Sequence, residues 1–261
     1  MKQSHTLDMN VRPATLLQPG ESNTKTNKNT LLTWSLSLAQ HTLSGRNVCP
    51  HATPGCIASC VGKAGLAGVF PMIVQARIRK TNWFFEDRSS FLEQLKDELL
   101  NADRYCAKRK TKGLVRLNTF SDIRWDRMID TKAYPNLRFY DYTKSLDSAK
   151  DSIGTNYRRI YSVNEHSDLA AVVAFVKSGG TAAVVFGDVE YNPSHGKLGK
   201  LPRRWNGLRV VDGDATDDRF NDPVGVVVGL RLKGTKAARA AACASGFARE
   251  SKTVALTVGG K

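Results

Sequence analysis

Three of the five cysteines in this 261-residue chain lie close together, in the stretch NVCPHATPGCIASCVG at residues 47–62. Cys56 and Cys60 are four residues apart, so their thiols would share one face of a helical turn. Cys49 precedes them across two prolines and a glycine, which bend the chain back towards that turn. Thiolates are soft ligands that suit zinc or an iron–sulfur cluster. We therefore predict that this loop holds a metal centre.

Several ligand sets are compatible with these cysteines. A structural zinc ion usually takes four ligands, and His51 lies awkwardly close to Cys49 for that role. Three thiolates with one open coordination position suit a four-iron [4Fe–4S] cluster, and this is the prediction we favour. Cys243 can complete the coordination from a distance and is favoured over Cys106. The predicted metal ligands are therefore Cys49, Cys56, Cys60 and Cys243. The alternatives are zinc, or reduced structural cysteines that pack as small hydrophobes.

The composition indicates a folded protein of a reducing compartment. Hydrophobic residues make up 41% of the chain, but no run of about eighteen apolar residues exists that could span a bilayer. The first ten residues, MKQSHTLDMN, lack the apolar segment of a signal peptide. We expect a cytoplasmic location, where disulfides are rare, and the odd number of cysteines also argues against a disulfide framework.

The charge points to an anionic partner. Lys and Arg number 39 against 24 Asp and Glu, which gives a net charge of +15. A polyanion is attracted to such a chain and releases counterions on binding. Nucleic acid, DNA or RNA, is the predicted partner, and an anionic membrane surface comes second. The alternative is a basic surface that is simply solvated.

Three basic segments are candidates for this contact: ARIRKTNWFF (76–85), KRKTK (108–112) and GKLGKLPRRWNG (196–207). Basic residues next to aromatic residues are typical of surfaces that grip single strands by phosphate contact and base stacking. In the first segment core packing explains the aromatic residues better, whereas in the third segment Trp205 is equally compatible with core packing. The predicted nucleic-acid-binding residues are Arg77, Arg79, Lys80, Lys108, Arg109, Lys110, Lys112, Lys197, Lys200, Arg203 and Arg204.

The strands and helices that position these residues are predicted to form one α/β domain. Residues 1–30 are polar and basic and are predicted to be a poorly ordered arm, followed by a single domain over 31–261. A strand is expected at 31–39, directly before the cysteine loop, and a helix over 91–100. Six further strands are expected at 114–120, 137–143, 158–164, 181–187, 208–214 and 224–232, with helices at 124–133 and 168–180. This alternation predicts βαβ units and a parallel sheet, as a partial or distorted barrel.

In parallel α/β folds the functional side chains follow the carboxyl ends of the strands. This rule selects Asn118, Asp122, Tyr142, Thr143, Lys144, Asn164, Glu165, Asp212 and Asp214. Lys144 and Glu165 can alternatively pair with each other. The acidic segment DGDATDDRFNDP (212–223) has no Glu to close a calcium loop of the EF-hand type, so ion pairs and turns explain it better than a divalent cation.

Several ordered blocks of the chain resemble a known family. SLSLAQHTLSGRNVCPHATPGCIASC, VRLNTFSDI, YPNLRFYDYTKS, SVNE, LPRRWNGLRVVDGDATDDRFNDP and SGFAR are similar to the phage family called gene product eighty-eight. That family in turn resembles radical SAM-like proteins, in which three cysteines hold a four-iron cluster at the mouth of a partial barrel. The usual Cys-x3-Cys-x2-Cys spacing of those proteins is replaced here by Cys-x6-Cys-x3-Cys, and Ser59 stands where an aromatic residue normally precedes the last cysteine.

The resemblance implies a protein of an infected bacterial host. Three functions remain open, and the sequence favours the first of them. The first is a nucleic-acid-binding protein whose cluster is structural or redox-sensing. The second is a radical SAM-like enzyme that uses S-adenosylmethionine to modify a nucleotide or a nucleic-acid base. The third is a zinc-stabilised protein that interacts with the host.

Overall fold

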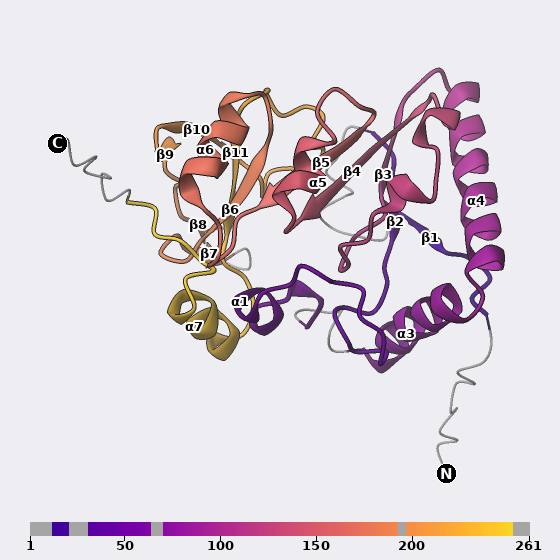
Figure 1. Ribbon diagram of the computed structural model, residues 1–261, viewed down its shortest axis with the longest axis horizontal. Helices are drawn as coiled ribbons and strands as arrows, with labels where there is room; N and C mark the ends of the chain where they lie inside the picture. Colours follow the sequence, from indigo (N-terminus) through magenta and orange to yellow (C-terminus); the bar gives the residue numbers. More distant parts are fainter. Residues whose placement is uncertain (1–11, 21–30, 64–69, 193–196, 253–261) are drawn as a thin grey trace, which may run out of the picture.

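A nine-stranded, mostly parallel sheet forms the centre of this mixed α/β fold (Figure 1). The computed structural model describes residues 12–20, 31–63, 70–192 and 197–252. The order of the strands across the sheet is β1-β2-β3-β4-β5-β6-β11-β10-β9. The strands are β1 (Leu17–Pro19), β2 (Thr33–Leu36), β3 (Gly113–Arg116), β4 (Leu137–Thr143), β5 (Tyr157–Ser162), β6 (Ala182–Phe186), β9 (Arg204–Trp205), β10 (Leu208–Asp212) and β11 (Val227–Arg231). A separate two-stranded sheet pairs β7 (Tyr191–Asn192) with β8 (Lys197–Leu198).

Five neighbouring strands, β2 to β6, follow one another in chain order and are all parallel. β11 continues the parallel arrangement beside β6, and β10 lies parallel to β11. Only the edges are antiparallel, where β1 pairs with β2 and β9 with β10. The expected strands and the parallel sheet are therefore confirmed. Because parallel strands run in one direction, their carboxyl ends meet at a single edge of the sheet.

The helices connect and cover these strands. They are α1 (Pro54–Ala58), α3 (Pro71–Glu86), α4 (Arg88–Lys108), α5 (Leu146–Lys150), α6 (Leu169–Lys177) and α7 (Lys236–Ala244), with 3₁₀ turns at Val61–Lys63, Trp125–Arg127 and Thr131–Ala133. The expected helix at 91–100 lies inside α4, which begins at the N-cap Asp87, and the one at 168–180 corresponds to α6. The helix expected over 124–133 is wrong, because that segment forms only the two short 3₁₀ turns.

The two faces of the sheet have different coverings. On one face, Val115 and Phe139 belong to the apolar core that also contains Phe91, Leu95 and Leu99 of α4. Further along the same face, α6 contributes to a core with β6 and β11. On the other face, Leu114, Tyr140, Ile160, Ala183 and Val228 form a smaller core with Phe220. The acidic segment 212–223 thus lies over the face that the helices leave open.

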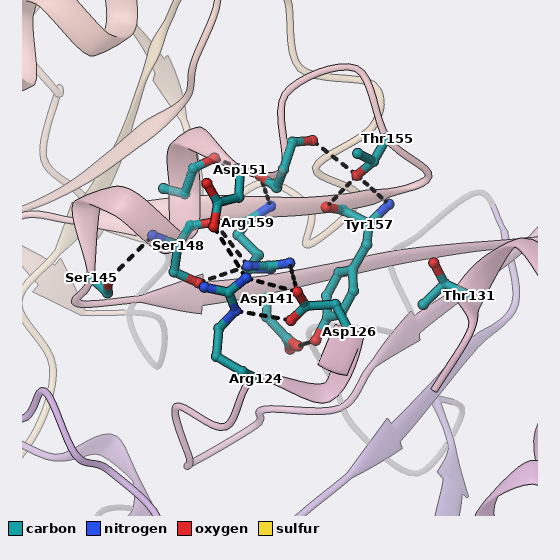
Figure 2. A network of polar contacts seen from close by, with 12 residues as sticks. Arg124, Asp126, Thr131, Asp141, Ser145, Ser148, Asp151, Thr155, Tyr157 and Arg159 are labelled. Carbon is teal, nitrogen blue, oxygen red and sulfur yellow. Dashed lines mark hydrogen bonds and ion pairs between the residues drawn. The ribbon is translucent and has the colours of Figure 1, made fainter. Parts of the chain in front are cut away.

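A partly buried polar network joins β4 and β5 to the loop after β3 (Figure 2). The Arg124 guanidinium forms two hydrogen bonds with Asp126, and Arg159 pairs with the same carboxylate at 2.8 Å. Beside this pair, the Tyr157 hydroxyl donates to Asp141, whose pKa is raised to about 7 mainly because the carboxyl is buried. The network holds the 118–126 loop against the sheet, which matters because this loop lines the site described below.

Part of the segment that the sequence assigns to a polar arm belongs to the sheet. Leu16 is fully buried, and β1 pairs with β2 through Leu17 and Leu36. Residues 1–11 and 21–30 of that predicted arm lie outside the described residues. Within the described part of the chain, no helix combines the length and the apolar character needed to cross a membrane.

Candidate functional site

A cavity of about 380 Å³ opens at the edge where the parallel strands end. Nearly every parallel strand, or the loop that follows it, contributes to its wall. The lining residues used below are Cys49, Cys56, Cys60, Arg116, Asn118, Thr119, Phe120, Asp122, Tyr142, Lys144, Ser162, Asp214, Asp217, Leu230, Arg231, Leu232, Lys233 and Phe247. The cavity is of the size typical of small-molecule sites. All three cysteines of the 47–62 loop therefore face one space.

Local chemistry explains the shape of the cysteine loop. Thr53 caps α1 by accepting a hydrogen bond from the backbone N–H of Cys56, and Pro54 occupies the first turn, where its missing N–H does no harm. The short helix carries Cys56, and Cys60 follows its end. Cys49 lies earlier in the loop, where its thiol donates to the Phe120 carbonyl oxygen at 3.2 Å. The loop after β3 therefore holds Cys49 directly.

Burial raises the pKa of the Cys49 thiol to about 12. The backbone N–H of His41 opposes this shift, whereas the neighbouring Cys60 and Cys56 thiols add to it. Cys49 is thus a neutral thiol as long as no cation is near, and it lies close enough to Cys60 and Cys56 for their charges to act on it. A soft metal would displace the proton on binding, because thiolate is the ligand form.

Glu165 lies just beyond the end of β5 and clamps the cysteine turn, which belongs to the loop after β2. Its carboxylate accepts the backbone N–H of Gly55 at 2.6 Å and the Thr53 hydroxyl at 2.8 Å. Burial disfavours ionisation of Glu165, but hydrogen bonds from its own backbone, Gly55 and Thr53 prevail and lower its pKa. A glycine is needed at position 55, since a Cβ there would lie 2.6 Å from that of Phe247 and 2.9 Å from the carboxylate.

Asn118 organises the loop after β3 and is already saturated with hydrogen bonds. Its side-chain oxygen accepts from the Ser121 hydroxyl, the Ile123 N–H and the Trp125 indole, and its amide donates to the Ile123 carbonyl and to Asp141. Its role is therefore to shape the cavity wall.

Asp122, in the loop after β3, forms hydrogen bonds to both the cysteine loop and the segment that follows β4. Its backbone N–H donates to the Val48 carbonyl at 2.8 Å, and its carboxylate accepts the backbone N–H of Lys144 at 2.9 Å. The Lys144 ammonium donates to the Ser162 hydroxyl at 2.5 Å, so it does not pair with Glu165 as one interpretation of the sequence allowed.

The remaining charges of the wall form ion pairs. Arg116 pairs with Asp217 at 2.8 Å, and the Tyr140 hydroxyl donates to the same carboxylate. Asp214 pairs with both Arg231 and Lys233, at 3.1 and 2.8 Å. The interpretation of segment 212–223 as an ion-pairing segment is thereby confirmed for these carboxylates.

The three cysteines can be compared with the ligand sets of a single metal ion and of a cluster. Among the residues that the structure describes, no group of three or more His, Cys, Asp or Glu side chains is placed to surround a single metal ion. The ligands of a cluster bind different iron atoms and are spread more widely, and three thiols on one cavity wall match that donor set. Cys49, Cys56 and Cys60 therefore match a cluster in the chemistry of their thiols, and all three line the same cavity.

The other two cysteines lie elsewhere. Cys243 is exposed on α7 and lines a different hollow, together with Gly187, Lys236 and Arg239. Cys106, near the end of α4, is fully buried in the core. The structure thus brings together three of the four predicted metal ligands.

The first basic segment lies on α3, and two of its three basic side chains form hydrogen bonds inside the protein. Arg77 is 3% exposed and donates to the Gly62 carbonyl, and Lys80 is 5% exposed and donates to the Leu16 carbonyl at 2.6 Å. Phosphate could reach neither side chain without displacing these contacts. Trp83 and Phe84 are buried, so the interpretation of these aromatic residues as core is confirmed. Arg79 is half-buried.

The other two basic segments are at the surface. Lys108, Arg109, Lys110 and Lys112 are exposed around the turn between α4 and β3. That turn precedes a parallel strand, and α4 begins beside α3 and runs to the opposite end of the molecule from the cysteine loop (Figure 1). Lys200, Arg203 and Arg204 are also exposed, but Trp205 is buried, and the side chain of Lys197 lies outside the described part.

Several cavity residues escape sequence reasoning. Ser162 is the last residue of β5 and Arg116 the last of β3, so the same strand-end rule, applied one or two residues earlier, could have found both. Phe247 lies in SGFAR near the end of the chain, and no sequence signal links it to the cysteine loop.

The fold and the cavity define an α/β protein with a mostly parallel sheet and a cysteine-lined site at its strand ends. The family model described as Gene product 88 matches residues 14–246, so the chain belongs to this family. Comparison with curated proteins finds no match, and comparison with solved structures finds none either.

Proposed function

We propose that this chain is an iron–sulfur enzyme of radical SAM-like type. In this proposal Cys49, Cys56 and Cys60 ligate a [4Fe–4S] cluster, and one iron remains open to a ligand bound in the cavity. The observation that carries the proposal is the convergence of the three thiols on one cavity at the strand ends, where α/β folds hold reacting groups.

The connectivity of the sheet supports a partial barrel. β2 to β6 and then β11 lie side by side in chain order, and the cysteine loop follows the first of these parallel strands. The mouth of the barrel would then be the cavity. When bound, the cluster would supply one-electron chemistry and a Lewis-acidic iron. The protein's own residues hold the cysteine turn through Glu165, and Phe120 and Phe247 add apolar surface to the lining of the cavity.

The position of Cys243 favours an open iron over ligation by four cysteines. Its side chain lines another hollow, so three cysteines remain for the cavity. The enzyme is therefore favoured over the binding protein with a purely structural cluster. S-adenosylmethionine is one co-substrate compatible with an open iron, and a nucleotide or a nucleic-acid base is the proposed substrate because the chain carries a net charge of +15.

The test is anaerobic purification followed by iron and sulfide analysis and visible absorption spectra. We expect the broad visible band of a thiolate-bound cluster. Cys49→Ala, Cys56→Ala and Cys60→Ala should each lose it, whereas the matched Cys243→Ala variant should keep it. A chain that carries zinc and no iron would support the zinc-stabilised alternative, and a metal-free chain would contradict both.

A second function, binding of nucleic acid, has its own observation. Four exposed cations, Lys108, Arg109, Lys110 and Lys112, surround one turn, and the Arg109 guanidinium lies over the Tyr105 ring at 3.6 Å. We propose that this turn contacts phosphates, at the edge of the sheet opposite the cavity.

Titration of DNA and RNA oligonucleotides at several salt concentrations tests this second proposal. Each phosphate contact contributes about 0.9 to the slope of log K against log salt for duplex DNA. Neutralising Lys108, Lys110 and Lys112 should lower that slope, whereas neutralising the exposed Lys96 and Lys177 should leave it nearly unchanged. An equal loss of slope in both sets would refute a specific role for the turn.

A further inference from the structure

One cation of the cavity stands apart from the others. Arg116 pairs with Asp217, and Arg231 and Lys233 pair with Asp214. Lys144 also lines the cavity, yet among the described residues no carboxylate lies within ion-pairing distance of its ammonium group.

Lys144 is nevertheless held in place from three directions. Its backbone N–H donates to Asp122, and its ammonium donates to the Ser162 hydroxyl at 2.5 Å. The ammonium also lies 5.2 Å from the centre of the Phe247 ring, within the range of a cation–π contact. Because the side chain is half-buried and the two groups that contact its ammonium are neutral, the positive charge is pre-positioned without an ion-pair partner, and an anion would satisfy it.

Two further donors belong to residues that line the cavity. The Thr119 hydroxyl is buried and has no hydrogen-bond partner, and the Nε–H of Arg116 has no acceptor. Both atoms are shielded from water, so they lie behind the surface of the cavity and do not offer their hydrogen bonds to its contents. Of these three groups, Lys144 is therefore the one that a carboxylate or a phosphate in the cavity would contact.

The rest of the wall suits an apolar body. Phe120, Phe247, Leu230 and Leu232 line the cavity, which has room for a molecule of about the size of an aromatic acid or larger. We propose that the cavity binds a small organic anion, a carboxylate or a phosphate monoester, with its charge on Lys144. This inference rests on the proposed use of the cavity as a ligand site but does not require the cluster.

Calorimetric titration of three matched probes tests the proposal: phenylacetate, phenyl phosphate and the neutral phenylacetamide. At least one anion should bind about tenfold more tightly than the amide, and Lys144→Met should abolish that preference. Lys144→Arg, which keeps the charge, should retain part of it, and Lys177→Met, an exposed cation on α6, should retain all of it. The relative affinities of the two anions decide between carboxylate and phosphate.

Equal binding of the amide and both anions, no binding of either anion, or a preference that survives in Lys144→Met would overturn the proposal. If Lys144→Met does not fold, as judged by circular dichroism, Lys144→Gln and the wild-type comparison decide. The variant with Ser at positions 49, 56 and 60 separates this inference from the proposed function. It cannot hold a thiolate-ligated cluster, yet it should keep the anion preference.

Discussion

Removal of the Glu165 carboxylate should loosen the cysteine turn. This carboxylate accepts hydrogen bonds from Gly55 and Thr53, and such bonds to a charged group contribute about 1.5–3 kcal/mol each when well buried. Because Glu165 is only partly buried, we expect Glu165→Ala to destabilise the turn by about 2 kcal/mol in total. Glu165→Gln, which keeps an acceptor but loses the charge, should cost about 1 kcal/mol.

The assay measures the rate at which Cys56 and Cys60 react with a thiol reagent in the metal-free protein. If labelling requires opening of the turn, about 2 kcal/mol raises the rate about 30-fold. Glu93→Gln, an exposed acid on α4, is the control. Because the pKa of Glu165 is lowered in the fold, its stabilisation is present above the ordinary value of 4.5 and is lost as the pH falls below it. Wild-type labelling rates in Glu165→Ala would refute the clamp.

Three further predictions concern stability and are checked by urea denaturation. Gly55→Ala should destabilise the protein by about 1–3 kcal/mol, because the new Cβ would meet Phe247. Burial raises the pKa of Asp141 from 3.8 to about 7. As the pH rises between these values, the free energy of unfolding should therefore fall by at most about 1.4 kcal/mol per pH unit, and Asp141→Asn should remove that slope. Burial lowers the pKa of Lys80 from 10.5 to about 8, so the free energy of unfolding should rise over this interval in wild type but not in Lys80→Met. Slopes that the substitutions leave unchanged would contradict both assignments.

The parallel sheet is predictable because its strands carry strong local signals. AAVVF and VVGLR are short, mostly apolar segments with two valines each, and the burial of β6 and β11 explains why. Helix α7 escapes prediction because KAARAAACA has no large apolar side chain at helical spacing. Its alanines, the strongest helix formers, are the signal that could have found it.

The segment 124–133 shows how a side chain can override local propensity. A helix is expected there, but Asn118 captures the Ile123 N–H and the Trp125 indole, which fixes the start of the segment as a loop. Asp130 then caps a separate short turn. These contacts come from a residue outside the segment, so no window over 124–133 contains them.

The candidate site is predictable in part for the same topological reason. The strand-end rule selects Asn118, Asp122, Tyr142, Lys144 and Asp214, and all five line the cavity. The rule cannot tell which of them already have all their hydrogen bonds, or that Lys144 is the lining cation without an ion pair among the described residues. In the ARIRKTNWFF segment, the burial of α3 against the cysteine loop and β1 decides that Arg77 and Lys80 point inward, and this depends on contacts distant in the chain.

In the proposed function, the thiols of Cys49, Cys56 and Cys60 hold a cluster with one open iron. The most direct measurement is the Mössbauer spectrum of anaerobically purified protein loaded with iron-57, recorded for wild type and Cys243→Ala. We predict that one iron of the cluster differs from the other three, and that Cys243→Ala leaves the spectrum unchanged. Four equivalent thiolate-bound irons, or a spectrum altered by Cys243→Ala, would contradict the open site, and absence of a cluster would contradict the account as a whole.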